Sequence, residues 1–352
     1  MMKAKKVMAM CLASTMLAGL FGETAISVSA DDKLKVALVL PGKKDDVSFN
    51  QSIYEGVENF VANRKDIDLQ VVENVYEVSD ITPTLTEFAD SGYDVVIGHG
   101  YQFTDPMIEV GAKYPDVNFL GGCTVKQSEN VGSYDVHLEA GGYLMGVVAA
   151  LATETNKIGV IGGGQGSEIT RGHEGFKAGA KSVNPTIEIQ EVFTGDWNDT
   201  SGAYEAAISM YDSGVDCIWH SGDGIGLGVV QAAAKKDKYV LGNVEEQTSL
   251  APEQVLSGIQ YRWDKPIEQM FKDIQDGSFR KKIGADKVYW ITVSNSGLEM
   301  VPLNDTKGTI SDEDKQVIDD TLKKLQNNEI TLPGDTSSST VDSAEVTESS
   351  AS

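Results

Sequence analysis

Short apolar runs alternate along this chain with longer segments of helical periodicity, and the same order of runs occurs twice. Residues 91–100 (SGYDVVIGHG) and 213–222 (SGVDCIWHSG) share a Ser-Gly-x-Asp opening, an apolar run and an ending of glycine and histidine. The apolar runs at 35–40 and 157–161 are separated by the same interval. A short apolar run after a turn signal is typical of a buried strand in a parallel sheet. Self-similarity over so long a period indicates a duplicated architecture.

The pattern predicts two consecutive βαβαβ units and a C-terminal return. The first unit has predicted strands at 35–40, 69–75, 94–98 and 118–121, and helices at 49–62, 82–90 and 105–114. A helix of small residues at 139–154 precedes the second unit, with strands at 157–161, 187–193, 216–220 and 239–242, and helices at 169–182, 204–212 and 227–235. The return is predicted as a segment at 253–260, a helix at 266–276, a hairpin of 288–293 with 298–301, and a last helix at 312–327.

This order predicts an α/β protein with two Rossmann-like lobes that face each other across a cleft. Ligands of open α/β sheets bind at the carboxyl ends of the strands, so both repeated strand ends should look into that cleft. We expect a discontinuous first lobe of residues 33–123 plus about 244–280. The second lobe then consists of residues 124–243 plus about 281–332.

The two ends of the chain differ from its middle. Lys3, Lys5 and Lys6 precede an apolar stretch and a small-residue site at Ala30, which predicts a signal peptide over residues 1–30 rather than a membrane anchor. Cys11 lacks the context of a lipidation site, so we expect no lipid there. Residues 333–352 are rich in Ser and Thr, and we expect a disordered tail. The mature protein is therefore predicted to be secreted, periplasmic or at the cell surface.

Charge and motifs exclude several classes of function. The formal net charge is −24, which argues against nucleic acid as a partner because phosphate binding needs clustered Lys and Arg. The glycine run at 162–166 meets neither the dinucleotide nor the P-loop fingerprint, and the four histidines lack metal-site spacing. No Gly-x-Ser-x-Gly elbow is present. We expect no cofactor, no metal, no catalytic residue and no enzymatic activity.

Aromatic residues gather near the predicted strand ends. A planar ligand is often held between aromatic faces, so these residues are candidates for ligand contacts. The set is Phe49, Tyr101, Phe103, Trp197 and Trp219.

Several segments resemble one known family. The opening motif DVSFNQSIYEG (46–56), TDPMIEVGAKYPDVNF (104–119), KIGVIGG (157–163), GFKAGAKSVNP (175–185) and GDWND (195–199) are similar to those of the basic membrane protein, or PnrA-like, substrate-binding proteins. The resemblance covers roughly residues 35–279. It implies a type I periplasmic-binding-protein fold with a hinge, an ABC permease as partner, and a nucleoside or nucleobase as ligand.

The resemblance also implies roles for particular residues. Phe49 and Trp219 match the aromatic positions that sandwich the base, and Asp46 and Asn50 match polar positions of the opening loop. Charged residues associated with ribose are replaced by Cys123, Val244 and Tyr261. That departure is closer to a branch associated with free purines, for which the matching positions are Asp223, Asn243, His137 and Trp263.

The expected function is that of an extracytoplasmic solute-binding protein of an ABC importer. It would be a monomer that closes on a purine base or nucleoside. Three alternatives stay open at this point: a ligand sensor that docks on a signalling receptor, a binder of another small polar solute, and an extracellular nucleoside-processing enzyme.

Overall fold

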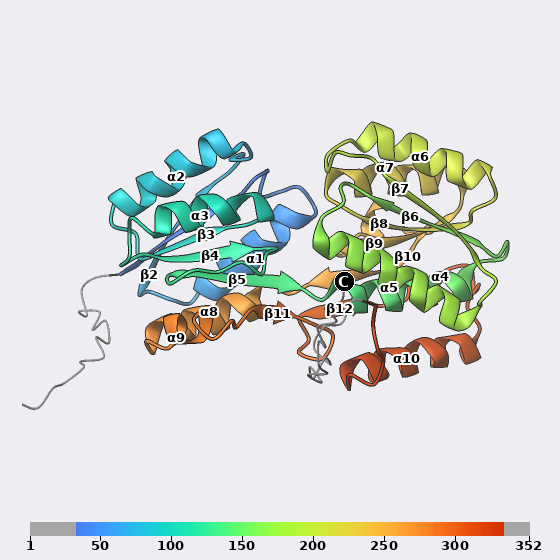
Figure 1. The fold of residues 1–352 in the computed structure, drawn as a ribbon. Coiled ribbons are helices and arrows are strands. Elements are labelled where there is room, and N and C mark those ends of the chain that lie inside the picture. Colours follow the sequence, from blue (N-terminus) through green and yellow to red (C-terminus); the bar gives the residue numbers. More distant parts are fainter. Residues whose placement is uncertain (1–32, 334–352) are drawn as a thin grey trace, which may run out of the picture.

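The computed structural model describes residues 33–333, which form two six-stranded sheets side by side (Figure 1). The predicted signal peptide, Cys11 and nearly all of the predicted tail lie outside the described residues. The first sheet has the order β11-β5-β4-β3-β1-β2, and its strands are β1 (Leu34–Val39), β2 (Ile67–Val72), β3 (Val95–Gly98), β4 (Asn118–Gly122), β5 (Val131–Val136) and β11 (Tyr289–Ile291). Every pair in it is parallel.

The second sheet repeats this arrangement with the order β12-β10-β9-β8-β6-β7. Its strands are β6 (Lys157–Gly162), β7 (Glu188–Phe193), β8 (Cys217–Ser221), β9 (Tyr239–Val244), β10 (Val255–Tyr261) and β12 (Leu298–Val301). Only the edge strand β12 is antiparallel to its neighbour. The predicted duplication and the two-lobed α/β fold are thereby confirmed.

Helices cover both faces of each sheet, so the inner strands are apolar on both sides, as parallel sheets require. In β1, Val36 and Leu38 belong to one core cluster and Ala37 and Val39 to another on the opposite face. The first lobe carries α1 (Phe49–Val61), α2 (Val78–Asp90), α3 (Thr104–Gly111), α8 (Asp264–Gln275) and α9 (Phe279–Ile283). The second carries α4 (Leu138–Ala152), α5 (Ser167–Val183), α6 (Thr200–Asp212), α7 (Gly224–Lys236) and α10 (Asp312–Gln326). Two short 3₁₀ turns are η1 (Tyr101–Phe103) and η2 (Thr248–Leu250).

The chain crosses between the lobes after β5, after β10 and after β11. The sheet pairing thus moves the predicted lobe boundaries. Strand β5 extends the first sheet beyond residue 123, β10 belongs to the second sheet, and β11 belongs to the first. The sheet that a strand joins is set by its long-range partner, which a local pattern does not contain.

The predicted hairpin of 288–293 with 298–301 is wrong for the same reason. Strand β11 pairs parallel with β5 in one sheet, whereas β12 pairs antiparallel with β10 in the other. The turn residues between them form a crossing between the lobes instead of a hairpin loop.

The small-residue helix α4 packs against α5 at unusually short range. A Cβ atom on Gly146 would lie 2.0 Å from the Phe176 carbonyl oxygen, and one on Gly179 would lie 1.9 Å from that of Tyr143. Since no side chain fits there, the glycines let the two backbones touch. The small residues of the predicted helix at 139–154 thus serve close helix packing.

Candidate functional site

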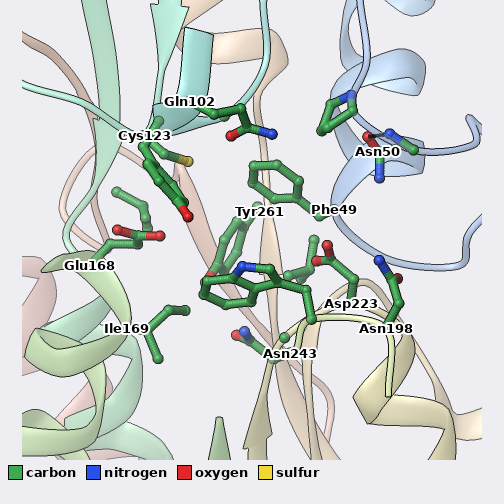
Figure 2. A pocket seen from close by; sticks show the side chains of 18 of the residues that line it. Phe49, Asn50, Gln102, Cys123, Glu168, Ile169, Asn198, Asp223, Asn243 and Tyr261 are labelled. Carbon is green, nitrogen blue, oxygen red and sulfur yellow. Dashed lines mark hydrogen bonds between the residues drawn. The ribbon is translucent and has the colours of Figure 1, made fainter. Parts of the chain in front are cut away.

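The carboxyl ends of the strands of both sheets face a common cleft, and an inner pocket lies at its bottom (Figure 2). Its empty volume, including space open to solvent, is about 750 Å³, which is within the range of small-molecule sites. The first lobe lines it with Pro41, Gly42, Phe49, Asn50, Tyr76, Gly100, Tyr101, Gln102, Cys123 and Val136. The second lobe lines it with Glu168, Ile169, Trp197, Asn198, Gly222, Asp223, Asn243, Val244 and Tyr261. Toward solvent the pocket widens into an outer cleft, which includes Lys43, Asp45, Asp46 and Asp196.

Asp46 and Asn50 shape the loop that enters the pocket from the first lobe. The Asp46 Oδ1 accepts hydrogen bonds from the amides of Ser48 and Gln51, each at 3.0 Å. Asn50 Nδ2 donates to Asp46 Oδ2 at 2.6 Å, and the Gly42 amide donates to Asn50 Oδ1 at 3.1 Å. Asp46 therefore accepts hydrogen bonds from the first amides of α1, and Ser48 at the N-cap position makes no side-chain cap hydrogen bond. Asn50 lines the inner pocket, while Asp46 lines only the outer cleft.

Phe49 lies against a rigid aromatic support. Its ring stacks on His99 with a centroid distance of 3.9 Å and an interplanar angle of 24°. His99 Nδ1 is 2.9 Å from the Tyr134 hydroxyl, and burial lowers the pKa of His99 to about 3. The imidazole is therefore neutral near pH 7, and it holds the Phe49 ring at the pocket wall without adding charge.

Trp197 enters the pocket from the second lobe over the glycine run. A Cβ atom on Gly163 would lie 2.6 Å from Trp197, and one on Gly164 would lie 2.9 Å from its ring. The glycines after β6 thus make room for the indole. The packing of Trp197 accounts for the glycine run at 162–166 without a bound phosphate.

Two strand ends at the pocket hold backbone strain. Cys123 follows β4 with a φ of 55°, and Val244 ends β9 with a φ of 72°. A positive φ is costly for a β-branched residue and is found mostly where the surrounding structure imposes it, frequently at binding sites. Both residues line the inner pocket, so the strain lies where the two lobes present their strand ends to a ligand.

Three polar groups of the second lobe face the pocket. Asn243 is 1% exposed, and its Oδ1 has no hydrogen-bond partner among the described residues. Asp223 precedes α7 and does not cap it with its side chain. Burial, together with the charges of Asp46 and Glu168, raises the pKa of Asp223 well above its usual range. Burial and the nearby charge of Asp135 raise the pKa of Glu168 to about 7.

Four predicted site residues lie outside both the inner pocket and the outer cleft. Trp219 is fully buried and stacks on Phe176 at 5.6 Å, and Phe103 is fully buried in the core behind β3. Trp263 is fully buried against His99 and Tyr134. His137 lies at the crossing after β5, where its Nδ1 is 2.7 Å from Glu139.

The strand alternation explains why Trp219 was misplaced. Successive side chains of β8 point to opposite faces of the sheet, and Trp219 falls on the face covered by α4 and α5. The carboxyl edge of the sheet is reached only after the strand ends, at Gly222 and Asp223.

Sequence reasoning missed Gln102, Glu168 and Asn198. Each follows a strand within a few residues, which is the signal that could have found them. Glu168 was overlooked because it opens helix α5, where an acidic residue has an ordinary role at the helix N-terminus.

Several other kinds of site are not seen in residues 33–333. No group of three His, Cys, Asp or Glu side chains in that range could hold a metal ion. Cys123 and Cys217 are buried and unpaired with each other. Within the same range, none of the helices has both the length and the apolar character needed to cross a membrane.

Comparison with curated proteins finds relatives along most of the chain. It is 36% identical over 244 residues to a CD4+ T-cell-stimulating antigen of Listeria innocua, which covers 66% of this chain and 68% of the relative. It is 31% identical to the ABC transporter nucleoside-binding protein BmpA of Lactococcus lactis, over 84% of this chain and 90% of that protein. It is 24% identical to a purine-binding protein of Brucella abortus, over 86% of this chain and 83% of that protein.

Solved structures agree with the fold. A solute-binding protein of an ABC transporter system from Conexibacter woesei superposes with a TM-score of 0.69 at 25% identity, over 85% of this chain and 98% of that one. A solute-binding protein of an ABC transporter system from Aeropyrum pernix gives a TM-score of 0.73 at 19% identity, over 86% and 95%, and supports the fold alone.

A family-level comparison matches residues 33–336 to the PnrA-like ABC transporter substrate-binding proteins. Proteins of this family bind a substrate for a transporter and are not enzymes, so the nucleoside-processing alternative is set aside. The chain belongs to the Bmp (PnrA-like) family of ABC transporter substrate-binding proteins.

Proposed function

We propose that the chain binds a purine-type nucleobase or nucleoside in the inner pocket and delivers it to an ABC permease outside the cytoplasm, acting as a monomer. The observation that carries the proposal is a set of aromatic rings that line one pocket from both lobes. Phe49, Tyr76 and Tyr101 come from the first lobe, and Trp197 and Tyr261 from the second. Such rings suit a planar heterocycle, which gains contact area on both of its faces.

Binding would couple to closure because the pocket is shared between the lobes. A ligand that touches Phe49 on one side and Trp197 on the other bridges two bodies joined by three crossings. Hinge closure then buries the ligand, and the closed form is the one that docks on the permease. The names of the Lactococcus and Brucella relatives, a nucleoside-binding and a purine-binding protein, support this class of ligand.

The pocket favours a free base over a nucleoside. Cys123, Val136 and Ile169 give one part of the wall an apolar character. Ribose hydroxyls placed there would lose water and find Glu168 as the one charged neighbour in that part of the lining, and an unpaired buried polar group costs about 1–3 kcal/mol. We therefore place adenine, hypoxanthine and guanine ahead of their nucleosides.

The test is thermal unfolding and titration calorimetry of the purified full chain against a panel. The panel holds adenine, hypoxanthine, guanine and uracil, their nucleosides, and unrelated sugars and amino acids. A purine at one hundred times its Kd should add about 2.7 kcal/mol of stability. A response to a sugar or amino acid with none to any purine or pyrimidine would overturn the proposed ligand class.

Two tryptophans provide matched variants. Trp197→Ala should weaken purine binding by about tenfold or more, since it removes a stacking face at the pocket. Trp219→Phe should lower the free energy of unfolding and leave the Kd of the folded protein nearly unchanged, because Trp219 is fully buried away from the pocket. Equal losses of affinity in both variants would contradict this placement of the site.

A further inference from the structure

The inner pocket carries acidic groups and no basic one. Its described lining includes the carboxyls of Glu168 and Asp223, and none of the lining residues is Lys, Arg or His. The outer cleft contributes one lysine, Lys43, beside the carboxyls of Asp45, Asp46 and Asp196. A ligand that enters therefore meets carboxyl groups of the lining, while the nearby cation, Arg171, lies outside that lining.

The same pocket holds acceptors that lack donors. The Asn243 Oδ1 is buried and unpartnered. Glu168 and Asp223 form no side-chain hydrogen bond with another residue of the range 33–333 that the structure describes. Figure 2 shows Glu168 on the Cys123 side of the pocket and Asp223 on the Asn198 side, with Asn243 below them. The acceptors are thus distributed around the space that a ligand would fill.

We propose that Glu168 is a specificity-determining residue, which with Asp223 and Asn243 selects uncharged or cationic ligands that present N–H donors and rejects anionic ones. This inference rests on the proposed function and narrows its substrate class to bases without a phosphate, carboxylate or other negative charge. A donor on the ligand satisfies a buried acceptor. An anion instead adds a like charge at close range in a site that excludes water.

The raised pKa values of Glu168 and Asp223 agree with this arrangement. Burial disfavours both carboxyls as anions, and at Glu168 it outweighs the opposing effects of the residue's own backbone amide and of Arg171. A ligand N–H group would stabilise the ionised form, and a ligand anion would disfavour it further.

The experiment compares Kd values by calorimetry for ligand pairs that differ in charge: hypoxanthine with urate, and adenosine with AMP. The full chain, Glu168→Gln and Asp45→Asn are measured at one ionic strength, with amino acids, sugars and the cation spermidine in the panel. Asp45 is an exposed carboxylate of the outer cleft, and at a pH above about 8, where Glu168 is ionised, its variant has the same change in net charge. We expect tight binding only of uncharged or cationic solutes. Glu168→Gln should reduce the discrimination against anions by about tenfold or more, whereas Asp45→Asn should change it by less than about twofold.

The outcomes separate the two proposals. Urate or AMP binding as tightly as the uncharged partner would overturn the charge selection and leave the purine ligand in place. Binding of a sugar or of spermidine alone would overturn the purine ligand and leave the charge selection in place. If Glu168→Gln discriminates against anionic ligands as strongly as the wild type does, Glu168 does not determine the charge selectivity. If the chain binds no member of the panel, both proposals are overturned.

Discussion

At the scale of single residues, the environment gives chemically similar side chains different roles. The Asp46 carboxylate accepts hydrogen bonds from backbone amides of its own loop. The Glu168 carboxyl faces the pocket and forms no side-chain hydrogen bond with another of the residues 33–333. The two tryptophans differ in the same way, since Trp197 lines the pocket and Trp219 lies in the core. Residue type alone therefore does not mark a contact with the ligand.

The raised pKa of Glu168 predicts a pH-dependent cost to stability. Its pKa in the folded chain is about 7, above the ordinary 4.5, so the folded state retains a proton that the unfolded state releases. The contribution of Glu168 to the free energy of unfolding therefore falls as the pH rises from about 4.5 through 7. Glu168→Gln should raise the free energy of unfolding of the ligand-free protein by on the order of 2 kcal/mol at high pH, and by much less in mild acid.

Urea unfolding of the wild type, Glu168→Gln and Asp45→Asn at pH values on both sides of the range gives the measurement. Asp45→Asn controls for net charge. A gain in stability from Glu168→Gln that is the same in acid and in base would show that the effect does not come from the titration of this carboxyl.

At the scale of elements, the packing of α4 on α5 fixes the second lobe. Gly142, Gly146, Gly175 and Gly179 each lie so close to the facing helix that a Cβ atom would meet backbone within about 2.1 Å. Backbone atoms cannot rotate away as a flexible side chain can. This contact also sets the position of the first turn of α5, which carries Glu168 into the pocket.

Gly179→Ala should therefore destabilise the protein by about 1–3 kcal/mol, the usual cost of overpacking. The alanine must push α5 away from Tyr143, where the added atom would lie 1.9 Å from the carbonyl oxygen. Lys181→Ala, on the exposed side of the same helix, is the control and should change stability by less than about 0.5 kcal/mol. Chemical denaturation of the two variants measures both changes in stability. Equal denaturation midpoints for Gly179→Ala and Lys181→Ala would contradict the close packing.

At the scale of the whole molecule, the crossings join two lobes that share a single pocket. Near the crossing after β5, Arg171 of α5 donates to the Val136 carbonyl at 2.9 Å and to Asp135 Oδ2 at 3.3 Å. This pair ties the second lobe to the end of a strand of the first. A ligand in the cleft would add further contacts between the lobes, which is the arrangement expected for a hinge.

A bound purine should therefore compact the molecule. Small-angle X-ray scattering of the full chain should show a smaller radius of gyration at saturating adenine than without ligand. Trp197→Ala, measured at the same adenine concentration, should stay close to the ligand-free value because its occupancy is lower. A radius that does not change at proven saturation would mean that binding occurs without closure.

Much of the fold was predictable because it repeats. The apolar runs at 35–40 and 157–161 and the two Ser-Gly-x-Asp segments predicted both sheets and their strand ends correctly. The candidate site was predicted only in part. Phe49, Asn50, Tyr101, Trp197, Asp223 and Asn243 line the pocket, whereas Phe103, His137, Trp219 and Trp263 do not. The errors fall on residues whose direction depends on strand register or on a crossing.

The sequence by itself determined the elements, the duplication and the family. These follow from apolar periodicity and turn residues, which act over a few neighbours in the chain. Only the tertiary structure decided that β10 joins the second sheet and β11 the first. It also decided that Trp219 belongs to the core and that Glu168 lines the pocket. Those outcomes depend on which distant strand or helix packs against each residue, and burial by a distant partner leaves no mark on the local pattern.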